Sequence, residues 1–196
     1  MTTHKTVFDN DFSIEKADEV YSYQTDLTKK LDKFDKPFDQ QTINEIVLWK
    51  INRYALISDQ ALELLNKIDP KSTELDSYLT TEILKALLQT KGIQLPMAST
   101  ILRFKNKNVY QIIDQRVYRM INSDKKLKLN LYQNDKNLAE QVELYLNYLS
   151  DLRIICSKQN IPFEKIDRIL FVADKRINKK IPLDNYSTKA HKIHEE

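Results

Sequence analysis

A short turn between two apolar segments carries residue types that suit the binding of a phosphate group. The turn is Lys91-Gly92-Ile93-Gln94, and Leu95-Pro96 then opens the next segment, with proline at a position that the first turn of a helix tolerates. Glycine adopts a positive φ without strain, and this is the single glycine of the chain, whereas proteins average about 7% glycine. The first amides of a helix lack partners within that helix and attract anions. Lys91 and Arg103 would strengthen a phosphate site built on these amides.

An acidic residue stands about twenty residues after this turn, where another helix is expected to begin. Asp114 precedes Gln115 in a position typical of an N-cap, whose side chain accepts a hydrogen bond from a backbone N–H of the first turn. Arg116 and Arg119 follow on the same helix and lie off its apolar stripe. They are candidates for phosphate contacts, with solvated surface charges as the alternative.

These residues resemble the helix-hairpin-helix module of the base-excision DNA glycosylase superfamily. In that superfamily a Leu-Pro-Gly-Val-Gly hairpin precedes an alanine-rich helix, and an aspartate follows at the start of the next helix in a Val-Asp-x-x-Val-x-Arg context. The corresponding residues of this chain are Gly92-Ile93-Gln94, then Pro96-Met97-Ala98-Ser99-Thr100-Ile101-Leu102, then Ile113-Asp114-Gln115-Arg116-Val117-Tyr118-Arg119.

The chain also resembles uncharacterised bacterial and archaeal proteins of this kind. These carry an upstream Trp-Lys-x-x-Arg element, here Trp49-Lys50-Ile51-Asn52-Arg53, and a downstream Asp-Arg-x-Leu element, here Asp167-Arg168-Ile169-Leu170. Asp167 and Arg168 could themselves form a structural ion pair. The resemblance covers roughly residues 40–175. It implies an all-α, glycosylase-like fold that binds duplex DNA.

Two positions depart from the pattern of the superfamily. Gln94 replaces the second glycine of the hairpin, which would distort the anion-binding turn. Pro96 occupies the position of the lysine that bifunctional members use, and this removes the amine that Schiff-base chemistry requires. The single cysteine, Cys156, excludes a four-cysteine iron–sulfur cluster within the chain. What remains is the pattern of a monofunctional glycosylase, or of a DNA-binding relative without catalysis.

The resemblance assigns the catalytic role to Asp114. Hydrolysis of a glycosidic bond passes through a sugar with oxocarbenium character, which a carboxylate can stabilise while it activates water. The target base must first leave the stack and enter a pocket. Trp49, Lys50, Arg53 and Tyr118 are the candidates to line that pocket, although a tryptophan in such a helix is more often a core residue.

Positive charge is concentrated in one region of the chain. Residues 85–128 hold ten basic residues and two acidic ones, whereas residues 1–40 hold nine acidic residues and six basic ones. A field of this sign attracts polyanions. Three functions therefore stay open: a monofunctional DNA glycosylase, a non-catalytic module that recognises DNA ends or distorted DNA, and an interaction domain for an acidic protein.

The composition narrows the class of protein. With 41% hydrophobic and 30% charged residues, the chain is expected to be globular rather than disordered. It has no apolar run of about 18 residues and no signal-peptide pattern, so we expect a cytoplasmic protein without a membrane segment. His4, His191 and His194 lie near the ends without further ligands, and we expect neither a metal nor another cofactor. A monomer is expected.

Apolar residues repeat with helical spacing nearly throughout, which predicts a compact all-α domain. The expected helices span residues 14–34, 41–54, 58–68, 75–88, 96–104, 114–121 and 136–158, with a last one beginning at residue 162. The predicted organisation is an acidic N-terminal helical extension at 1–38, a helix-hairpin-helix glycosylase-like domain at 39–181 and a polar C-terminal tail at 182–196.

Overall fold

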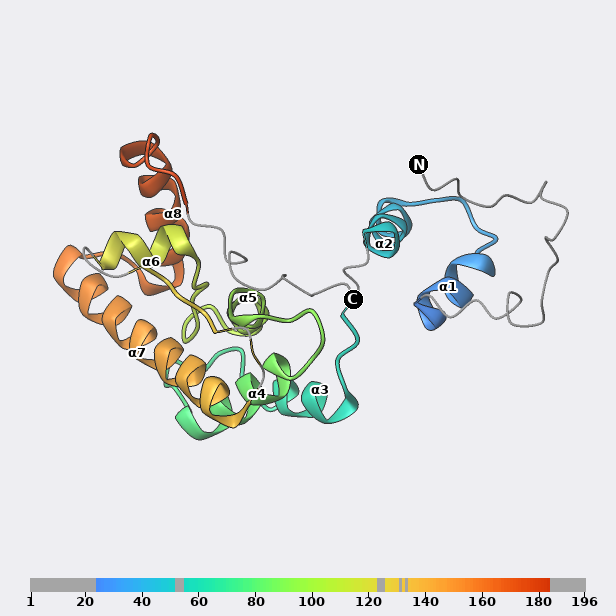
Figure 1. Cartoon of the computed structure of the whole chain (residues 1–196), viewed down its shortest axis with the longest axis horizontal. Helices are drawn as coiled ribbons and strands as arrows, with labels where there is room; N and C mark the ends of the chain where they lie inside the picture. The colour runs from blue at the N-terminus through green and yellow to red at the C-terminus, as the bar shows by residue number, and fades with distance from the viewer. Residues whose placement is uncertain (1–23, 52–54, 123–125, 131, 133, 184–196) are drawn as a thin grey trace, which may run out of the picture. The chain divides into compact units, whose positions relative to one another are not determined.

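The computed structural model of this protein describes residues 24–51, 55–122, 126–130, 132 and 134–183. Within this part of the chain the regular elements are eight α-helices and one short 3-10 turn, without a strand, which confirms the all-α prediction (Figure 1). The chain divides into two compact units, Met1–Tyr54 and Ala55–Glu196. The first unit includes the helix at residues 40–50, whereas the sequence-based division ended the N-terminal extension at residue 38.

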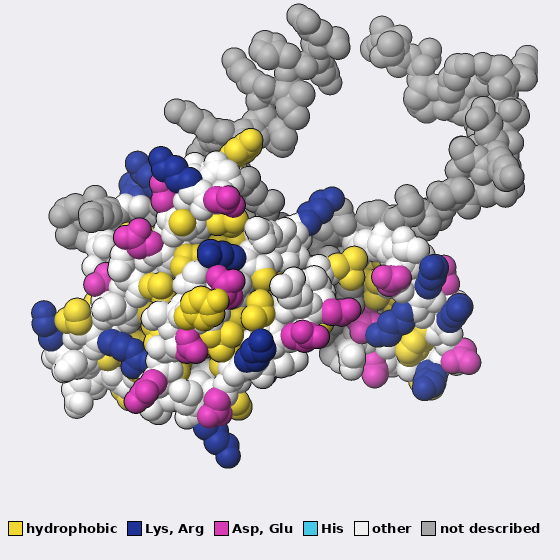
Figure 2. Space-filling model, turned by 90° about the horizontal axis from the view of Figure 1, so that it is seen from below, with side chains coloured by type: hydrophobic (Ala, Val, Ile, Leu, Met, Phe, Trp, Pro, Cys, Tyr) yellow, Lys and Arg dark blue, Asp and Glu magenta, His cyan; other side chains and the backbone are white. Residues whose placement is uncertain are grey.

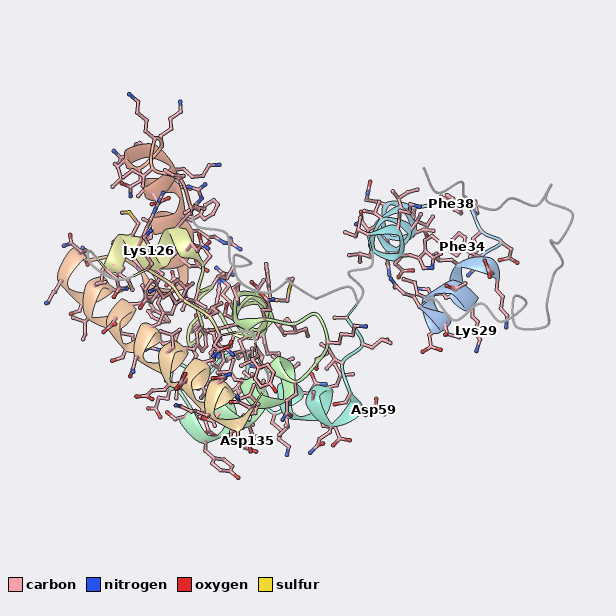
Figure 3. The ribbon with its side chains drawn as sticks, viewed as in Figure 1. Lys29, Phe34, Phe38, Asp59, Lys126 and Asp135 are labelled. Carbon is pink, nitrogen blue, oxygen red and sulfur yellow. The ribbon has the colours of Figure 1, made fainter. Side chains whose placement is uncertain are left out.

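The described part of the first unit is a pair of packed helices, α1 (Thr25–Asp32) and α2 (Gln40–Lys50). The indole Nε1 of Trp49 donates to Thr28 Oγ1 at 2.8 Å and so joins the two helices. In the connecting segment the rings of Phe34 and Phe38 lie near each other, with centroids 5.5 Å apart (Figure 3). Trp49 is therefore part of the packing between α1 and α2.

The first unit has little buried apolar surface among its described residues. Leu27 is its buried hydrophobic side chain, at 3% exposure. The side chains of Ile43, Val47 and Ile51 repeat with helical spacing along α2, yet they are 42%, 50% and 53% exposed. The repeat predicted the helix correctly, but periodicity alone does not show whether anything covers the apolar face of a helix.

The second unit contains the remaining elements. In chain order they are α3 (Asp59–Asn66), α4 (Ser77–Leu88), α5 (Leu95–Lys105), α6 (Gln115–Ile121), α7 (Asp135–Gln159), the 3-10 turn η2 (Phe163–Lys165) and α8 (Ile166–Ile177). Helix α4 packs against α3, α5 and α7, and α6 packs against α7 and α8. Figure 1 shows the long helix α7 running along one side of this unit. Each helix lies within a few residues of an expected one.

The core of the second unit follows the helical repeat of the sequence. On α7 the side chains at spacings of three and four residues are buried: Leu138, Val142, Tyr145, Leu149 and Leu152. Helix α7 packs against α4, whose side chains Ile83, Leu84 and Leu87 are fully buried. Burial of one such side chain contributes roughly 1.5–3 kcal/mol. The apolar stripes therefore set how these helices pack.

Side-chain caps define where most helices begin. Ser58, Asp76, Asp114 and Asn134 each accept a hydrogen bond from the backbone N–H three residues ahead, at the starts of α3, α4, α6 and α7. Helix α7 ends at Asn160, which adopts a left-handed conformation with φ of 52°. Asparagine tolerates this region better than most residues and here takes the role that glycine usually has.

Candidate nucleic-acid interface

The turn between α4 and α5 has the backbone geometry that the sequence predicted. Gly92 has a φ of 85°, and the Ile93 N–H donates to the Thr90 carbonyl at 3.1 Å to close the turn. Ile93 is buried at 3% exposure and anchors the turn to the core, whereas Lys91 and Gln94 are exposed. Gln94 is the N-cap of α5 but makes no side-chain cap bond. The backbone amides at the start of α5 therefore lack the cap that begins α3, α4, α6 and α7.

We expect Gly92→Ala to lower the free energy of unfolding by about 1 kcal/mol. The cause is the positive φ alone, because a Cβ at this position would meet nothing within 4 Å. Gly92→Asn is the matched control and should lose less, since asparagine enters the left-handed region more readily. Urea unfolding of the two variants measures the difference. If both variants matched the wild type, the positive φ would not be required.

A buried loop connects α5 to α6 and fixes the position of Asp114. Polar side chains from three helices bind the backbone of this loop. Tyr145 Oη donates to the Gln111 carbonyl at 2.9 Å, and Tyr148 Oη donates to the Ile112 carbonyl at 2.7 Å. The Ile113 N–H donates to Ser99 Oγ at 3.1 Å, and the Ile112 N–H donates to Asp167 Oδ2 at 3.2 Å. These four bonds hold the residues just before Asp114.

Asp114 is the N-cap of α6, as its sequence position indicated. Its Oδ1 accepts from the Val117 N–H at 2.8 Å. Burial raises the pKa of this carboxyl above the usual range of an aspartate, while the hydrogen bonds from the backbone N–H groups of Val117 and Arg116 act in the opposite direction. The result is a half-buried carboxyl in a fixed position, with a pKa closer to neutral than that of an exposed aspartate.

Arg103 is not on the surface of the protein. Its side chain is 7% exposed, its Nη2 donates to the Glu164 carbonyl at 3.0 Å, and its Nε lies 3.4 Å from Asp167 Oδ2. The phosphate contact expected at Arg103 is therefore not available in this structure. The ion pair expected between Asp167 and Arg168 is also corrected, because Asp167 pairs with Arg103 and Arg168 is exposed.

Arg116 and Arg119 converge on one buried carboxylate of α8. Arg116 Nη1 lies 2.9 Å from Asp174 Oδ2, and Arg119 Nη2 donates to the same oxygen at 2.7 Å. Asn178 Nδ2 donates to Asp174 Oδ1 at 2.9 Å. The Asp174 side chain is fully buried, whereas those of Arg116 and Arg119 are 28% and 19% exposed. The hydrogen bond from Arg119 is the main cause that lowers the pKa of Asp174, to about 2.

The described residues that were predicted to line a base pocket belong to different units of the chain. Trp49 and Lys50 belong to α2 in the first unit, and Arg53 lies outside the described residues. Tyr118 is in the second unit, where its side chain is 9% exposed and belongs to the core. A hollow of about 350 Å³ lies elsewhere in that unit, and its walls include neither Tyr118 nor Asp114.

The basic region of the sequence is less basic on the surface than its composition suggests. Three of its ten cationic side chains, those of Arg103, Arg116 and Arg119, pair with Asp167 and Asp174 of α8. On the face drawn in Figure 2, basic and acidic side chains of the larger unit alternate without forming a continuous area of one sign. A count over residues 85–128 could not include these compensating acids, because they lie about fifty residues further along the chain.

Asp174 is the important residue that the sequence analysis missed. It follows Ile166 and Leu170 at intervals of four residues, so it occupies the buried stripe of α8. A charged residue on an apolar stripe requires a buried partner of opposite charge. This spacing was the available signal, and the two arginines of α6 are the partners.

Two features are absent from the residues that the structure describes. No helix in this part of the chain is long and apolar enough to cross a membrane. Nor does any cluster of three histidine, cysteine or acidic side chains in it have the arrangement to hold a metal ion. His4, His191 and His194 lie outside the described ranges. Comparison with known proteins found no matching family model, no matching curated protein and no matching solved structure.

Proposed function

We propose that this protein binds duplex DNA through the hairpin between α4 and α5. The observation that carries the proposal is the turn itself: Gly92 at a φ of 85° leads into α5, whose first turn has no side-chain cap. Such a helix start binds an anion through its backbone amides and dipole. Lys91 is exposed beside the turn and adds a flexible cation for the same phosphate.

The finer proposal is that the protein excises a modified or damaged base as a monofunctional glycosylase, with Asp114 as its catalytic carboxylate. The support is positional. Asp114 follows a loop whose backbone is held by buried side chains, so its carboxylate has little freedom. A carboxylate held in a fixed position is suited to stabilise a cationic sugar, and a raised pKa makes it a stronger base for the activation of water.

A non-catalytic DNA-binding module is the second candidate. One observation favours it: the Asp114 carboxylate already caps α6 through the Val117 N–H. Both candidates share the hairpin as the binding surface. They differ in whether substitution of Asp114 removes a base-releasing activity.

Binding to duplex DNA should be weak and should fall steeply with salt, and Lys91→Ala should reduce the slope by about one unit in a plot of log affinity against log salt concentration. Lys91 is the appropriate probe because its side chain is exposed, whereas Arg103 and Arg116 support the fold. Fluorescence anisotropy with labelled duplexes measures the slope.

Lys158→Ala is the matched control for this measurement, since Lys158 is an exposed lysine in the last turn of α7. It should leave the salt slope unchanged if the hairpin makes the contact. Equal effects of the two substitutions would indicate attraction by overall charge, and an absence of binding at low salt would remove the proposal.

A further inference from the structure

The hollow in the second unit lies between the segment 128–130 and the first half of α7. Its walls are formed by Lys128, Leu129, Asn130, Asn137, Glu140, Gln141 and Leu144. Its volume of about 350 Å³ is at the lower end of the range of pockets that bind small molecules. None of the residues proposed above for the hairpin surface takes part in it.

Two buried amides give this hollow a fixed lining. Asn137 and Gln141 are 6% and 8% exposed. Asn137 accepts from Asn130 Nδ2 at 3.1 Å and donates to the Tyr132 carbonyl at 2.7 Å, so both of its amide atoms are engaged. Gln141 Nε2 donates to the Asn130 carbonyl at 3.1 Å, which sets the orientation of that amide. The two amides therefore hold the segment 128–130 against α7.

Among the residues that line the hollow, the polar groups with free hydrogen-bonding capacity are two acceptors and one cation. Among the described residues, Gln141 Oε1 accepts no hydrogen bond, although the other end of the same amide is engaged. Glu140 contributes a carboxylate whose only ion pair in this part of the chain is a long one, 3.9 Å from Lys136. Lys128 is exposed and pairs with no described acid. Leu129 and Leu144 supply apolar surface.

We propose that this hollow binds a guanine nucleotide through Gln141, Glu140 and Lys128. The ligand must present N–H donors to Gln141 Oε1 and to the Glu140 carboxylate, and it must carry an anionic group for Lys128. The Watson–Crick edge of guanine offers two adjacent donors, its ring N–H and its exocyclic amine, whereas adenine places an acceptor at the ring position. The apolar side chains of Leu129 and Leu144 suit the faces of a planar base. The phosphate supplies the anion.

The nucleotide can be free or the end of a nucleic-acid strand, because both present the same base and phosphate. This site does not depend on the hairpin, so either proposal can fail without the other. Titrations with guanosine monophosphate and with a short oligonucleotide ending in guanine distinguish the two sources. Binding of either one supports the site.

The test is an NMR titration of the full chain with guanosine monophosphate, guanosine, ribose 5-phosphate and adenosine monophosphate. Guanosine monophosphate should shift the amide signals of residues 128–130 and 137–144 and should bind most tightly. Guanosine should bind about tenfold more weakly, because it lacks the phosphate that Lys128 contacts. Ribose 5-phosphate and adenosine monophosphate should bind more weakly still.

Two variants of exposed residues test which side chain contacts the phosphate and which contacts the base, without disturbing the core. Lys128→Ala should lower the affinity for guanosine monophosphate to that for guanosine, and it should leave the affinity for guanosine unchanged. Glu140→Gln should weaken both guanine ligands, and the control Lys158→Ala should affect neither. The proposal is overturned if millimolar guanosine monophosphate shifts none of these signals, if ribose 5-phosphate or adenosine monophosphate binds as tightly, or if both variants bind like the wild type.

Discussion

Asp114→Asn is expected to reduce base release by about a hundredfold or more while the stability of the fold and the affinity for DNA stay near their wild-type values. Asparagine retains the oxygen that accepts the Val117 N–H at 2.8 Å, so the cap of α6 survives. The substitution removes the negative charge that would stabilise a cationic sugar. The measurement is base release, under single-turnover conditions, from an oligonucleotide that the wild type cleaves.

Asp76→Asn is the matched control for that experiment. Asp76 caps α4 through the Leu79 N–H at 2.9 Å, which is the same chemistry at another helix. It should leave both stability and base release unchanged. Retained base release in Asp114→Asn would assign Asp114 to structure alone. If a broad panel of modified bases shows no release by the wild type, the non-catalytic binding module becomes the function of choice.

The pH dependence of base release gives a further readout of Asp114. Burial raises the pKa of this carboxyl. As the pH falls, a reaction that needs the ionised form of Asp114 should therefore begin to slow at a higher pH than a reaction that depends on an exposed aspartate.

Because Pro96 stands where a lysine would be needed, borohydride should trap no covalent protein–DNA adduct at that position.

Asp174→Ala is expected to lower the free energy of unfolding by about 3 kcal/mol. The substitution leaves the guanidinium groups of Arg116 and Arg119 without their shared partner between α6 and α8. Removal of one member of a buried ion pair costs roughly 3–5 kcal/mol, and the lower end applies because both arginines keep some contact with water. Chemical denaturation followed by circular dichroism measures the loss.

Asp151→Ala is the control for this effect, since Asp151 is an exposed aspartate of α7. Its free energy of unfolding should change little in either direction. An equally small change for Asp174→Ala would show that the arginines do not hold α6 to α8 through this carboxylate.

The same ion pair predicts a loss of stability in acid. The folded-state pKa of Asp174 is about 2 and the ordinary value is 3.8, so the unfolded chain takes up the proton first as the pH falls. The stabilisation by Asp174 is thus fully present above about pH 4 and is lost between about pH 4 and pH 2, with a size of about 2 kcal/mol. In Asp174→Asn this part of the pH dependence should disappear. A wild-type acid profile that the variant reproduces would contradict the assignment.

Local sequence signals were sufficient for the helices and for two special positions. Apolar repeats predicted most of the helices, because a helix that packs on a core must place apolar residues three or four apart. The single glycine predicted the positive φ at Gly92, since few other residues adopt it without strain. The position of Asp114 before α6 predicted its cap bond, which involves only residues three apart.

Ion pairs between residues far apart in the sequence determine which of the predicted phosphate-binding arginines are engaged within the fold. Arg103, Arg116 and Arg119 were expected at a phosphate surface, but their partners Asp167 and Asp174 lie on α8, more than fifty residues away in the chain. The packing of α8 against α6 brings Asp174 to Arg116 and Arg119. Arg103 of α5 reaches Asp167 at the start of α8 and the Glu164 carbonyl of η2. A charge count over a sequence window cannot include such partners.

The sequence by itself thus determined the all-α class, the order of the helices, the turn at Gly92 and the cap at Asp114, because each depends on neighbours within a few residues. The tertiary structure alone decided which cations remain at the surface and where a hollow forms. The hollow between residues 128–130 and α7 depends on Asn137 and Gln141, whose bonds to Asn130 join two separate segments. The burial and pairing of polar groups depend on which helices and segments pack against one another, and no local pattern of residue types specifies that packing.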